Sequence, residues 1–397
     1  FCNLKKARIC GEFSNISNFV KASHNFLVAS SHYGITVVYT NEQKLVSFTS
    51  AQVHNLYSPN SSSNLESKLS QFKTTFLPLE EGSEVVSLGC NSDGRILSVL
   101  VGTNSGPFVY FYDFCALSPK QKQDVGYFQS IRLSVEKSSK GTDLQWNPAV
   151  ANNFAVITSD GTLSVYQVDI NNPKEFIIIG KFSLKVPGTC LCWSPKGKQV
   201  VVGDANGNLL QFKPNMTLVR TVPPPNNMGL IKAQQLRCVG ICWVSTTEFF
   251  IAHSGSDSED LVVSLLHAKK EGPPQWTHYL ESVYCSDHCS YPQRVFFIPI
   301  FQWNLLLCAS SRSSEVTVFG KCNGSWKVWS LNDNSRIELP LSGSQDDSFP
   351  FGICIETSSQ VPVKIGEDSE HDGRICPCVF IFTTCGFLVS YSALSLE

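Results

Sequence analysis

The chain of 397 residues carries 31 basic and 33 acidic residues, and 42% of its residues are apolar. This near balance of charge argues against a polybasic surface that could hold nucleic acid, so we expect no direct nucleic-acid binding. Only two residues are Met whereas 26 are Phe, and Ser, Val, Gly and Pro are frequent, a composition that favours an all-β fold with almost no long helix.

The N-terminal sequence FCNLKKARIC lacks the hydrophobic core of a signal peptide, and the chain contains no run of about 18 apolar residues. We therefore expect a soluble, intracellular protein that does not contact a membrane. Many of the 16 cysteines lie inside strand-like apolar runs, where a free Cys behaves as a small hydrophobic residue. The sequence accordingly predicts reduced, metal-free thiols.

Short apolar runs separated by tight turns recur along the chain, and each run is too short for a helix. The clearest copies are DLQWNPAVANNFAVITSDGTLSVYQV and CLCWSPKGKQVVVGDANGNLLQFKP, in which Trp146 and Trp193 are 47 positions apart. Asp160-Gly161 and Asn206-Gly207 supply turn residues that tolerate positive φ. The seven copies cover residues 25–40, 85–114, 143–168, 190–214, 238–266, 294–320 and 351–393.

A repeat of this period with three or four strands is typical of β-propeller blades. We predict one domain over residues 1–397, an all-β, seven-bladed, WD40-like β-propeller. The last unit ends after its third strand, so residues 4–9 (LKKARI) should add the outer strand and close the ring. The units lack the Gly-His and Trp-Asp of the WD40 consensus. Polar insertions predict surface loops at residues 57–71, 118–126, 136–141, 254–260 and 367–373.

No catalytic or cofactor motif is present in the sequence. It contains neither a Gly-x-Ser-x-Gly elbow nor a phosphate-binding glycine loop, so we expect no enzyme activity and no cofactor. Several histidines stand alone near a strand or a turn, which favours structural or solvated roles over ligation. They are His24, His32, His54, His253 and His267.

The nearest approach to a metal site is the stretch YCSDHCSY, with Cys285, Asp287, His288 and Cys289. A structural zinc site needs a second pair of ligands, which this stretch lacks, and the Cys-Pro-Cys at 376–378 is a weaker candidate. We therefore interpret the stretch as a surface loop with free thiols and expect no metal.

The sequence NDNSRIELPLSGSQDDSFPFG (332–352) joins the sixth unit to the seventh. It combines a cation, acidic residues and apolar side chains, which could contact a protein partner. From this chemistry alone, an ordinary solvated loop is the favoured interpretation, because charged residues are common in loops. The residues concerned are Arg336, Glu338, Leu341, Asp346, Asp347 and Phe349.

Four stretches, CWSPKGKQVVVGDANGNLLQFKP, QWNPAV, ASSRSSEVTVFG and SRIELPLSGSQDDSFPFG, resemble the N-terminal propeller of the family of the large cytoplasmic-face nucleoporin CAN, the 214-kilodalton nucleoporin. The resemblance implies a docking platform at the cytoplasmic side of the nuclear pore complex. It implies binding of a DEAD-box RNA helicase of mRNA export through propeller loops, in competition with RNA.

Matched to the family, Arg336, Leu341 and Asp347 correspond to its helicase-contacting residues, and the neighbours Glu338 and Asp346 are further candidates. The chain has no array of Phe-Gly repeats and no coiled-coil heptads, so contacts with other nucleoporins are expected from regions outside it. The alternative hypothesis is a generic WD40-like scaffold for another intracellular protein complex.

Overall fold

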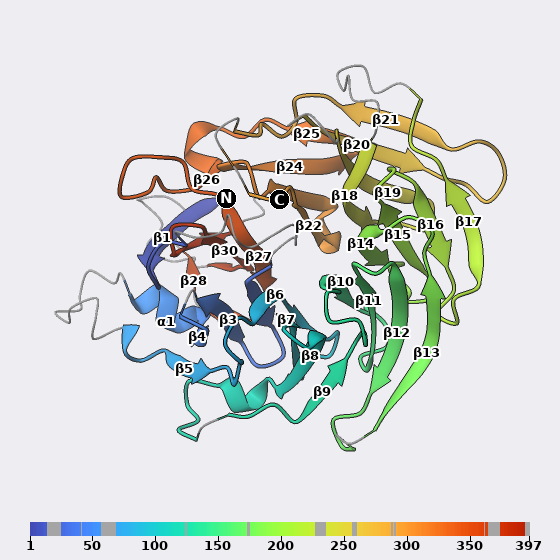
Figure 1. The fold of residues 1–397 in the computed structure, drawn as a ribbon. Helices are drawn as coiled ribbons and strands as arrows, with labels where there is room; N and C mark the ends of the chain where they lie inside the picture. Colours follow the sequence, from blue (N-terminus) through green and yellow to red (C-terminus); the bar gives the residue numbers. More distant parts are fainter. Residues whose placement is uncertain are drawn as a thin grey trace.

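Short antiparallel sheets are arranged around a central axis in the computed structural model (Figure 1). The described residues are 1–13, 25–40, 42–56, 69–123, 125–172, 175–226, 236–255, 260–286, 289, 291–360, 362–363 and 374–393. We number the sheets as blades 1 to 7 in chain order. This arrangement confirms the predicted seven-bladed β-propeller.

Blades 1 to 3 are built from consecutive strands, each with the innermost strand first. Blade 1 contains β2 (Leu27–Ser30), β3 (Ile35–Thr40), β4 (Lys44–Thr49) and β5 (Lys73–Phe76). Blade 2 contains β6 (Glu84–Cys90), β7 (Ile96–Thr103), β8 (Gly106–Asp113) and β9 (Gln129–Arg132). Blade 3 contains β10 (Gly141–Trp146), β11 (Asn153–Thr158), β12 (Thr162–Val168) and β13 (Phe176–Ser183).

Blades 4 to 6 repeat this order, and blade 6 gains a short fifth strand. Blade 4 contains β14 (Gly188–Trp193), β15 (Val200–Asp204), β16 (Leu209–Phe212) and β17 (Leu218–Val222). Blade 5 contains β18 (Leu236–Trp243), β19 (Glu248–Gly255), β20 (Leu261–His267) and β21 (Gln275–Tyr279). Blade 6 contains β22 (Val295–Ile300), β23 (Leu305–Ser310), β24 (Glu315–Cys322), β25 (Ser325–Trp329) and β26 (Ile337–Glu338).

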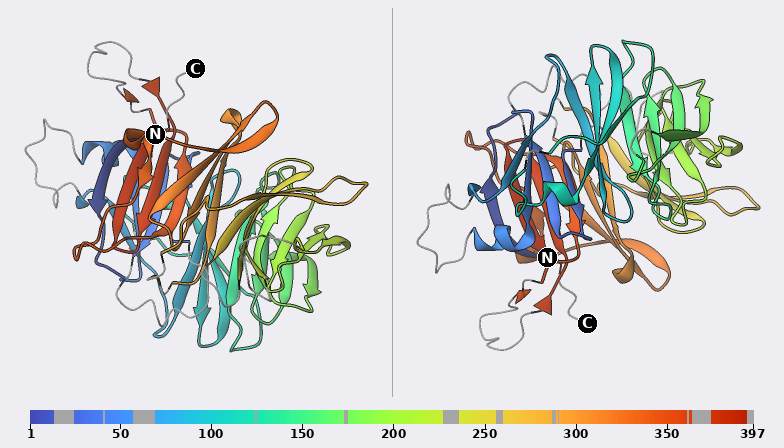
Figure 2. Two further views of the ribbon diagram at one scale, coloured as in Figure 1. Left: turned by 90° about the horizontal axis from the view of Figure 1, so that it is seen from above. Right: turned by 90° about the horizontal axis from the view of Figure 1, so that it is seen from below.

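Blade 7 joins the two ends of the chain. Its order is β27 (Pro350–Glu356), β30 (Cys378–Thr383), β31 (Phe387–Ser392) and β1 (Cys2–Arg8). Strand β1 runs antiparallel to β31, with Arg8 opposite Phe387, and the blue N-terminal strand lies beside the red strands in Figure 2. The predicted ring closure is confirmed, with the strand beginning two residues earlier than the predicted segment. It covers the edge that β31 would otherwise expose.

The remaining elements are short. They are β28 (Pro362–Val363) paired with β29 (Arg374–Ile375), α1 (Ser50–Asn55), η2 (Cys115–Leu117), η3 (Phe301–Trp303) and η4 (Asp333–Ser335). None of the helices that the structure describes has the length and apolar character needed to span a membrane. Of the predicted loops, 118–126 and 136–141 are largely described as connections between strands. Residues 57–68, 256–259 and 367–373 of the others lie outside the described residues.

The turns form where the sequence predicts them. Gly161 and Gly207 adopt φ of 81° and 77°, in the left-handed region that favours glycine. At the second of these turns, a carboxylate oxygen of Asp204 accepts hydrogen bonds from the backbone N–H groups of Asn206 and Asn208, at 2.9 and 2.8 Å. The side chain therefore fixes the hairpin locally, as Asp commonly does in turns.

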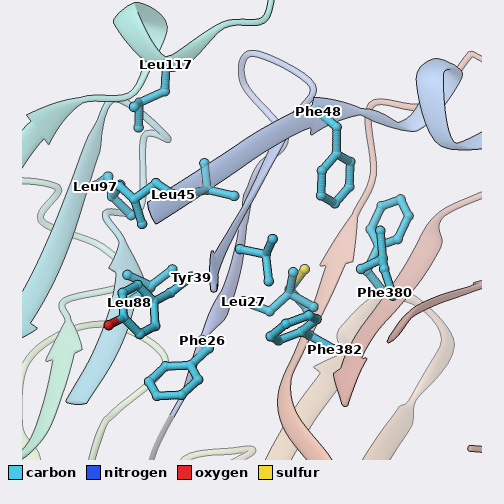
Figure 3. Close-up of a cluster of buried hydrophobic side chains, with 14 of the residues drawn as sticks. Phe26, Leu27, Tyr39, Leu45, Phe48, Leu88, Leu97, Leu117, Phe380 and Phe382 are labelled. Carbon is cyan, nitrogen blue, oxygen red and sulfur yellow. The ribbon is translucent and has the colours of Figure 1, made fainter. Parts of the chain in front are cut away.

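Packing between blades forms the core, because each sheet buries both faces against its neighbours. Figure 3 shows one such interface, where Phe26 and Phe48 of blade 1 lie between Leu88 of blade 2 and Phe380 of blade 7. The ring centroids of Phe48 and Phe380 are 5.8 Å apart in an edge-to-face contact. Such contacts add to the free energy gained by burying apolar area.

The innermost strands of successive blades contact one another all the way round the ring. They enclose a central cavity of about 520 Å³ lined by residues of several blades. Asp143 of blade 3 and Arg294, which precedes β22 of blade 6, form a buried ion pair beside this cavity, with Nη2 and Oδ1 3.5 Å apart. Asp143 also accepts the backbone N–H of Leu191 in blade 4 at 2.9 Å.

Candidate docking surface

Residues 330–349 connect blade 6 to blade 7 and include β26, which is labelled in Figure 1. All five predicted contact residues lie in this connection. We call it the blade 6–7 loop. It begins with the single turn of η4 and continues into β26, which pairs with the start of β24 through Ile337 and Val316. Ile337 is buried, so an apolar side chain anchors the first half of the loop to the blade.

Arg336 lies between η4 and β26 with a half-exposed side chain. Its Nη2 is 3.5 Å from Oδ1 of Asp333, whose own side chain is almost fully exposed. An exposed pair of this kind contributes less than about 1 kcal/mol to stability. The guanidinium can therefore exchange Asp333 for a carboxylate on a partner at little cost.

Glu338 is exposed because the short strand alternates its side chains, with Ile337 and Leu339 buried on either side. The backbone is fixed here, since Tyr391 Oη donates to the Glu338 carbonyl at 2.6 Å and Leu339 N donates to Ser314 O at 2.9 Å. In the β24/β26 register, Glu338 lies directly opposite Glu315, which is also exposed. Like charges in this position are unfavourable unless a cation joins them.

A tight turn presents the second half of the loop. The backbone N–H of Ser342 donates to the Asp346 carbonyl at 2.8 Å, and the backbone N–H of Asp346 donates to Ser342 Oγ at 3.0 Å. Gln345, inside the turn, adopts a φ of 69°. Ser348 Oγ donates to the Pro340 carbonyl, which ties the two ends of the turn together. Leu341 is 48% exposed on this braced turn, although leucine is usually buried.

Asp346 and Asp347 are both exposed on the far side of the turn. Asp346 accepts a hydrogen bond from Ser344 Oγ at 2.5 Å, whereas Asp347 has no ion-pair or hydrogen-bond partner within the described part of the chain. Asp347 can therefore bind a cation on another molecule without breaking an internal contact.

The N-terminal segment also lies against this surface, which sequence reasoning did not anticipate. A Cβ built on Gly343 would be 3.8 Å from Oε1 of Glu12, and Glu12 itself pairs with Arg8 at 3.3 Å. Burial raises the pKa of the Cys385 thiol, and the negative charges of Glu12 and Asp346 raise it further. Glu12 and Glu315 thus join the acidic side of the surface, but neither is adjacent to the loop in sequence.

The other sequence candidates do not form a second site. No group of three metal-ligating side chains occurs within the described residues, and Asp287 and His288 lie outside them. The cysteines whose side chains are described form no disulfide with one another. The fully buried His253 places Nε2 3.1 Å from the Gly207 carbonyl, and burial lowers its pKa to about 4. His24 lies outside the described residues, and His32, His54 and His267 join no such group.

Comparison with protein families gives one match that covers most of the chain. A family model described as the NUP159/214 beta propeller matches residues 20–388. Nuclear pore complex protein Nup214 of Drosophila melanogaster is 32% identical over 341 residues, covering 84% of this chain and 19% of that protein. Nup214 of Homo sapiens is 28% identical over 403 residues, covering 96% and 18%. The chain therefore spans about a fifth of the length of these relatives.

Solved structures share the fold at low sequence identity. A chain in the structure of S. cerevisiae Dbp5 bound to Nup159, Gle1, IP6 and ADP superposes with a TM-score of 0.68 at 17% identity, covering 98% of this chain and 93% of that one. A chain of the mitotic checkpoint complex gives a TM-score of 0.59 at 13% identity, with coverage of 99% and 96%.

Proposed function

Because this chain belongs to the NUP159/214 β-propeller family, we propose that it is a non-enzymatic docking platform that binds a DEAD-box RNA helicase through the blade 6–7 loop. The relatives it matches are nuclear pore proteins. In this proposal the platform lies at the cytoplasmic face of the pore and supports mRNA export, and other nucleoporins bind outside this chain.

One observation carries the proposal: the loop holds an exposed leucine between opposite charges on a rigid backbone. In the chain, Leu341 lies between Arg336 on one side and Asp346 and Asp347 on the other, and hydrogen bonds fix the backbone on both sides of the leucine. An apolar contact surrounded by oriented charges is typical of interfaces in which the apolar part holds the complex and the charges set its orientation.

The charge of the surface favours a basic partner. Glu12, Glu315, Glu338, Asp346 and Asp347 supply five carboxylates, against the two cations Arg336 and Arg8. Binding of a basic face here would relieve the repulsion between Glu315 and Glu338. It would also add new ion pairs across the interface. The solved complex that contains Nup159 together with the helicase Dbp5 supports this choice of partner. We infer that the helicase face overlaps its RNA-binding surface, so RNA and the propeller exclude each other.

The test is calorimetry with a DEAD-box helicase of mRNA export. Asp347→Arg should weaken binding by about 2 kcal/mol or more, because it places like charges in contact at the interface. Leu341→Asp should do the same by removing the apolar contact. Neither side chain supports the fold, since both are exposed. Added single-stranded RNA should compete with the propeller, and the reduction in affinity should be reciprocal.

Glu271→Arg is the matched control, because it makes the same charge change at an exposed residue after β20, far from the loop in the strand order. It should leave the affinity within about 0.5 kcal/mol of the wild type. Equal binding by wild type and Asp347→Arg, with unchanged circular dichroism, would remove the helicase assignment. The generic scaffold hypothesis would then replace it.

A further inference from the structure

A second surface depression lies between blades 4 and 5, with a volume of about 760 Å³. We call it the blade 4–5 groove. Its volume falls in the range of about 300–1,000 Å³ that is usual for ligand sites. The side chains that matter here are four cations and two valines: Lys196, Lys198, Arg220, Lys270, Val219 and Val244.

The groove opens on the face of the propeller opposite the blade 6–7 loop. It is formed where the innermost strands β14 and β18 end, by the turns that follow Trp193 and Trp243. The blade 6–7 loop instead enters the start of an innermost strand, β27. Innermost strands run in the same direction around a propeller, so the starts and ends of these strands lie on opposite faces.

The lining of the groove is positively charged and contains no carboxylate. Lys196, Lys198 and Lys270 are exposed, and none of them has an ion-pair partner within the described residues. Arg220 is held in place by neutral groups, with Nε 2.6 Å from Gln211 Oε1 and Nη1 3.1 Å from the Lys269 carbonyl. Its charge is therefore not neutralised by these contacts.

Glu248, an acid that contacts the groove residue Ser245, is already paired. Glu248 accepts hydrogen bonds from Lys321 Nζ at 2.8 and 3.0 Å and from Ser245 Oγ at 2.9 Å. It therefore cannot neutralise the groove lysines without breaking those contacts. A chain whose net charge is only −2 thus concentrates four cations in a groove whose lining contains no carboxylate.

The apolar part of the groove indicates which kind of polyanion fits. Val219 is 44% exposed on the outer strand β17, whereas the one aromatic ring of the described lining, Trp243, is only 5% exposed. Single-stranded nucleic acid is usually held by exposed aromatic rings on which bases stack. Exposed aliphatic side chains beside lysines instead suit an extended peptide with acidic residues and one aliphatic anchor.

We propose that the blade 4–5 groove binds an acidic, extended peptide segment of a partner protein. An aliphatic side chain of the segment packs against Val219 and Val244, and its carboxylates pair with Lys198, Lys270 and Arg220. Charge complementarity selects the occupant, since unpaired cations around an apolar patch attract the opposite charge and orient it. This site is independent of the helicase proposal, because it lies on the other face of the propeller.

The experiment selects random 16-residue peptides displayed on phage against the immobilised wild-type propeller. The Lys198→Glu/Lys270→Glu variant serves for counter-selection. The recovered peptides should contain several Asp or Glu residues and an aliphatic residue. Measured by fluorescence anisotropy, a recovered peptide should bind the double variant and a Val219→Asp variant about tenfold or more weakly than wild type, because each change removes one part of the complementarity.

Lys120→Glu/Lys122→Glu is the control, since it makes the same charge change at two exposed lysines between β8 and β9. It should bind the recovered peptide as wild type does, and thermal melting should show that all variants are folded. The proposal is overturned if selection recovers no acidic peptide, if both double variants bind equally, or if a twelve-nucleotide poly(U) RNA binds the groove as tightly as the peptide. Helicase binding should be unchanged in the groove variants.

Discussion

Three tryptophans at equivalent positions of successive blades differ in one hydrogen bond. Trp146 Nε1 donates to Ser98 Oγ at 2.9 Å, and Trp193 Nε1 donates to the Gln145 carbonyl at 3.0 Å. Trp243 Nε1 is buried and has no acceptor within the described residues. The indole rings of Trp193 and Trp243 are otherwise similarly buried, at 4% and 5% exposure.

This difference predicts unequal costs for the same substitution. Trp193→Phe should lower the free energy of unfolding by about 1 kcal/mol more than Trp243→Phe, because only the former breaks a hydrogen bond of the indole N–H. Both changes remove the same volume, so the second is the control for the first. Denaturant unfolding of the two variants measures the difference, and an equal or larger loss for Trp243→Phe would contradict it.

His253 makes the stability of the fold dependent on pH. Burial lowers its pKa from 6.5 to about 4, and Nε2–H donates to the Gly207 carbonyl while Nδ1 has no partner within the described residues. Below about pH 6.5 the unfolded chain takes up a proton that the folded chain resists until about pH 4. The free energy of unfolding therefore falls as pH falls through this window.

His253→Gln should remove most of this pH dependence, because glutamine keeps a donor for the carbonyl and does not titrate. The full effect is about 3 kcal/mol between pH 7 and pH 4, from the size of the pKa shift. Burial also lowers the pKa of His278, which adds to the trend in both proteins. Unfolding curves at pH 7, 5.5 and 4.5 provide the comparison, and parallel losses in the wild type and the variant would show that His253 is not responsible.

At the scale of elements, β1 is the strand that closes the ring. It forms six register pairs with β31. The chain then continues along the turn after β30, where Ile9 N donates to Gly386 O at 2.8 Å and Phe13 N donates to Thr384 O at 3.1 Å. Phe13 is buried among the rings of Phe26 and Phe351.

Deleting residues 1–9 should lower the free energy of unfolding by about 3 kcal/mol or more, because the interstrand hydrogen bonds of β1 contribute about 0.5–1.5 kcal/mol each. The exposed edge of β31 should also promote association. Calorimetric melting and light scattering measure the two effects. A synthetic peptide of residues 1–13 should restore part of the stability by mass action, whereas a scrambled peptide should not. An unchanged melting temperature after the deletion would contradict the role given to β1.

At the scale of the whole molecule, the pair of Asp143 and Arg294 connects blades that are far apart in sequence. Asp143→Asn should lower the free energy of unfolding by about 3 kcal/mol, because it removes one carboxylate charge that faces a largely buried guanidinium. The double variant Asp143→Asn/Arg294→Gln should regain part of that loss, since both charges of the pair are then removed from the interior. A double-mutant cycle from urea unfolding measures the coupling, and strictly additive losses would show that the pair contributes nothing.

The blades and the ring closure could be predicted from the sequence, but only part of the candidate docking surface could. The blade 6–7 loop and its charged residues can be picked out because they are contiguous in the chain. Glu12 and Glu315 cannot, since they come close to the loop only through the closure of blade 7 and the register of β26 on β24. No sequence signal near the loop could have identified either residue.

The sequence by itself determined the features of this protein that depend on local physics. Alternation of apolar residues sets the strands, Asp-Gly and Asn-Gly fix the turns, and the incomplete last unit requires a strand from the other end of the chain. Only the tertiary structure decided which distant side chains meet. The Asp143–Arg294 pair, the acidic surround of the blade 6–7 loop and the blade 4–5 groove each combine residues of different strands or blades. Their contacts depend on the angle and register at which the blades pack, which no local pattern encodes.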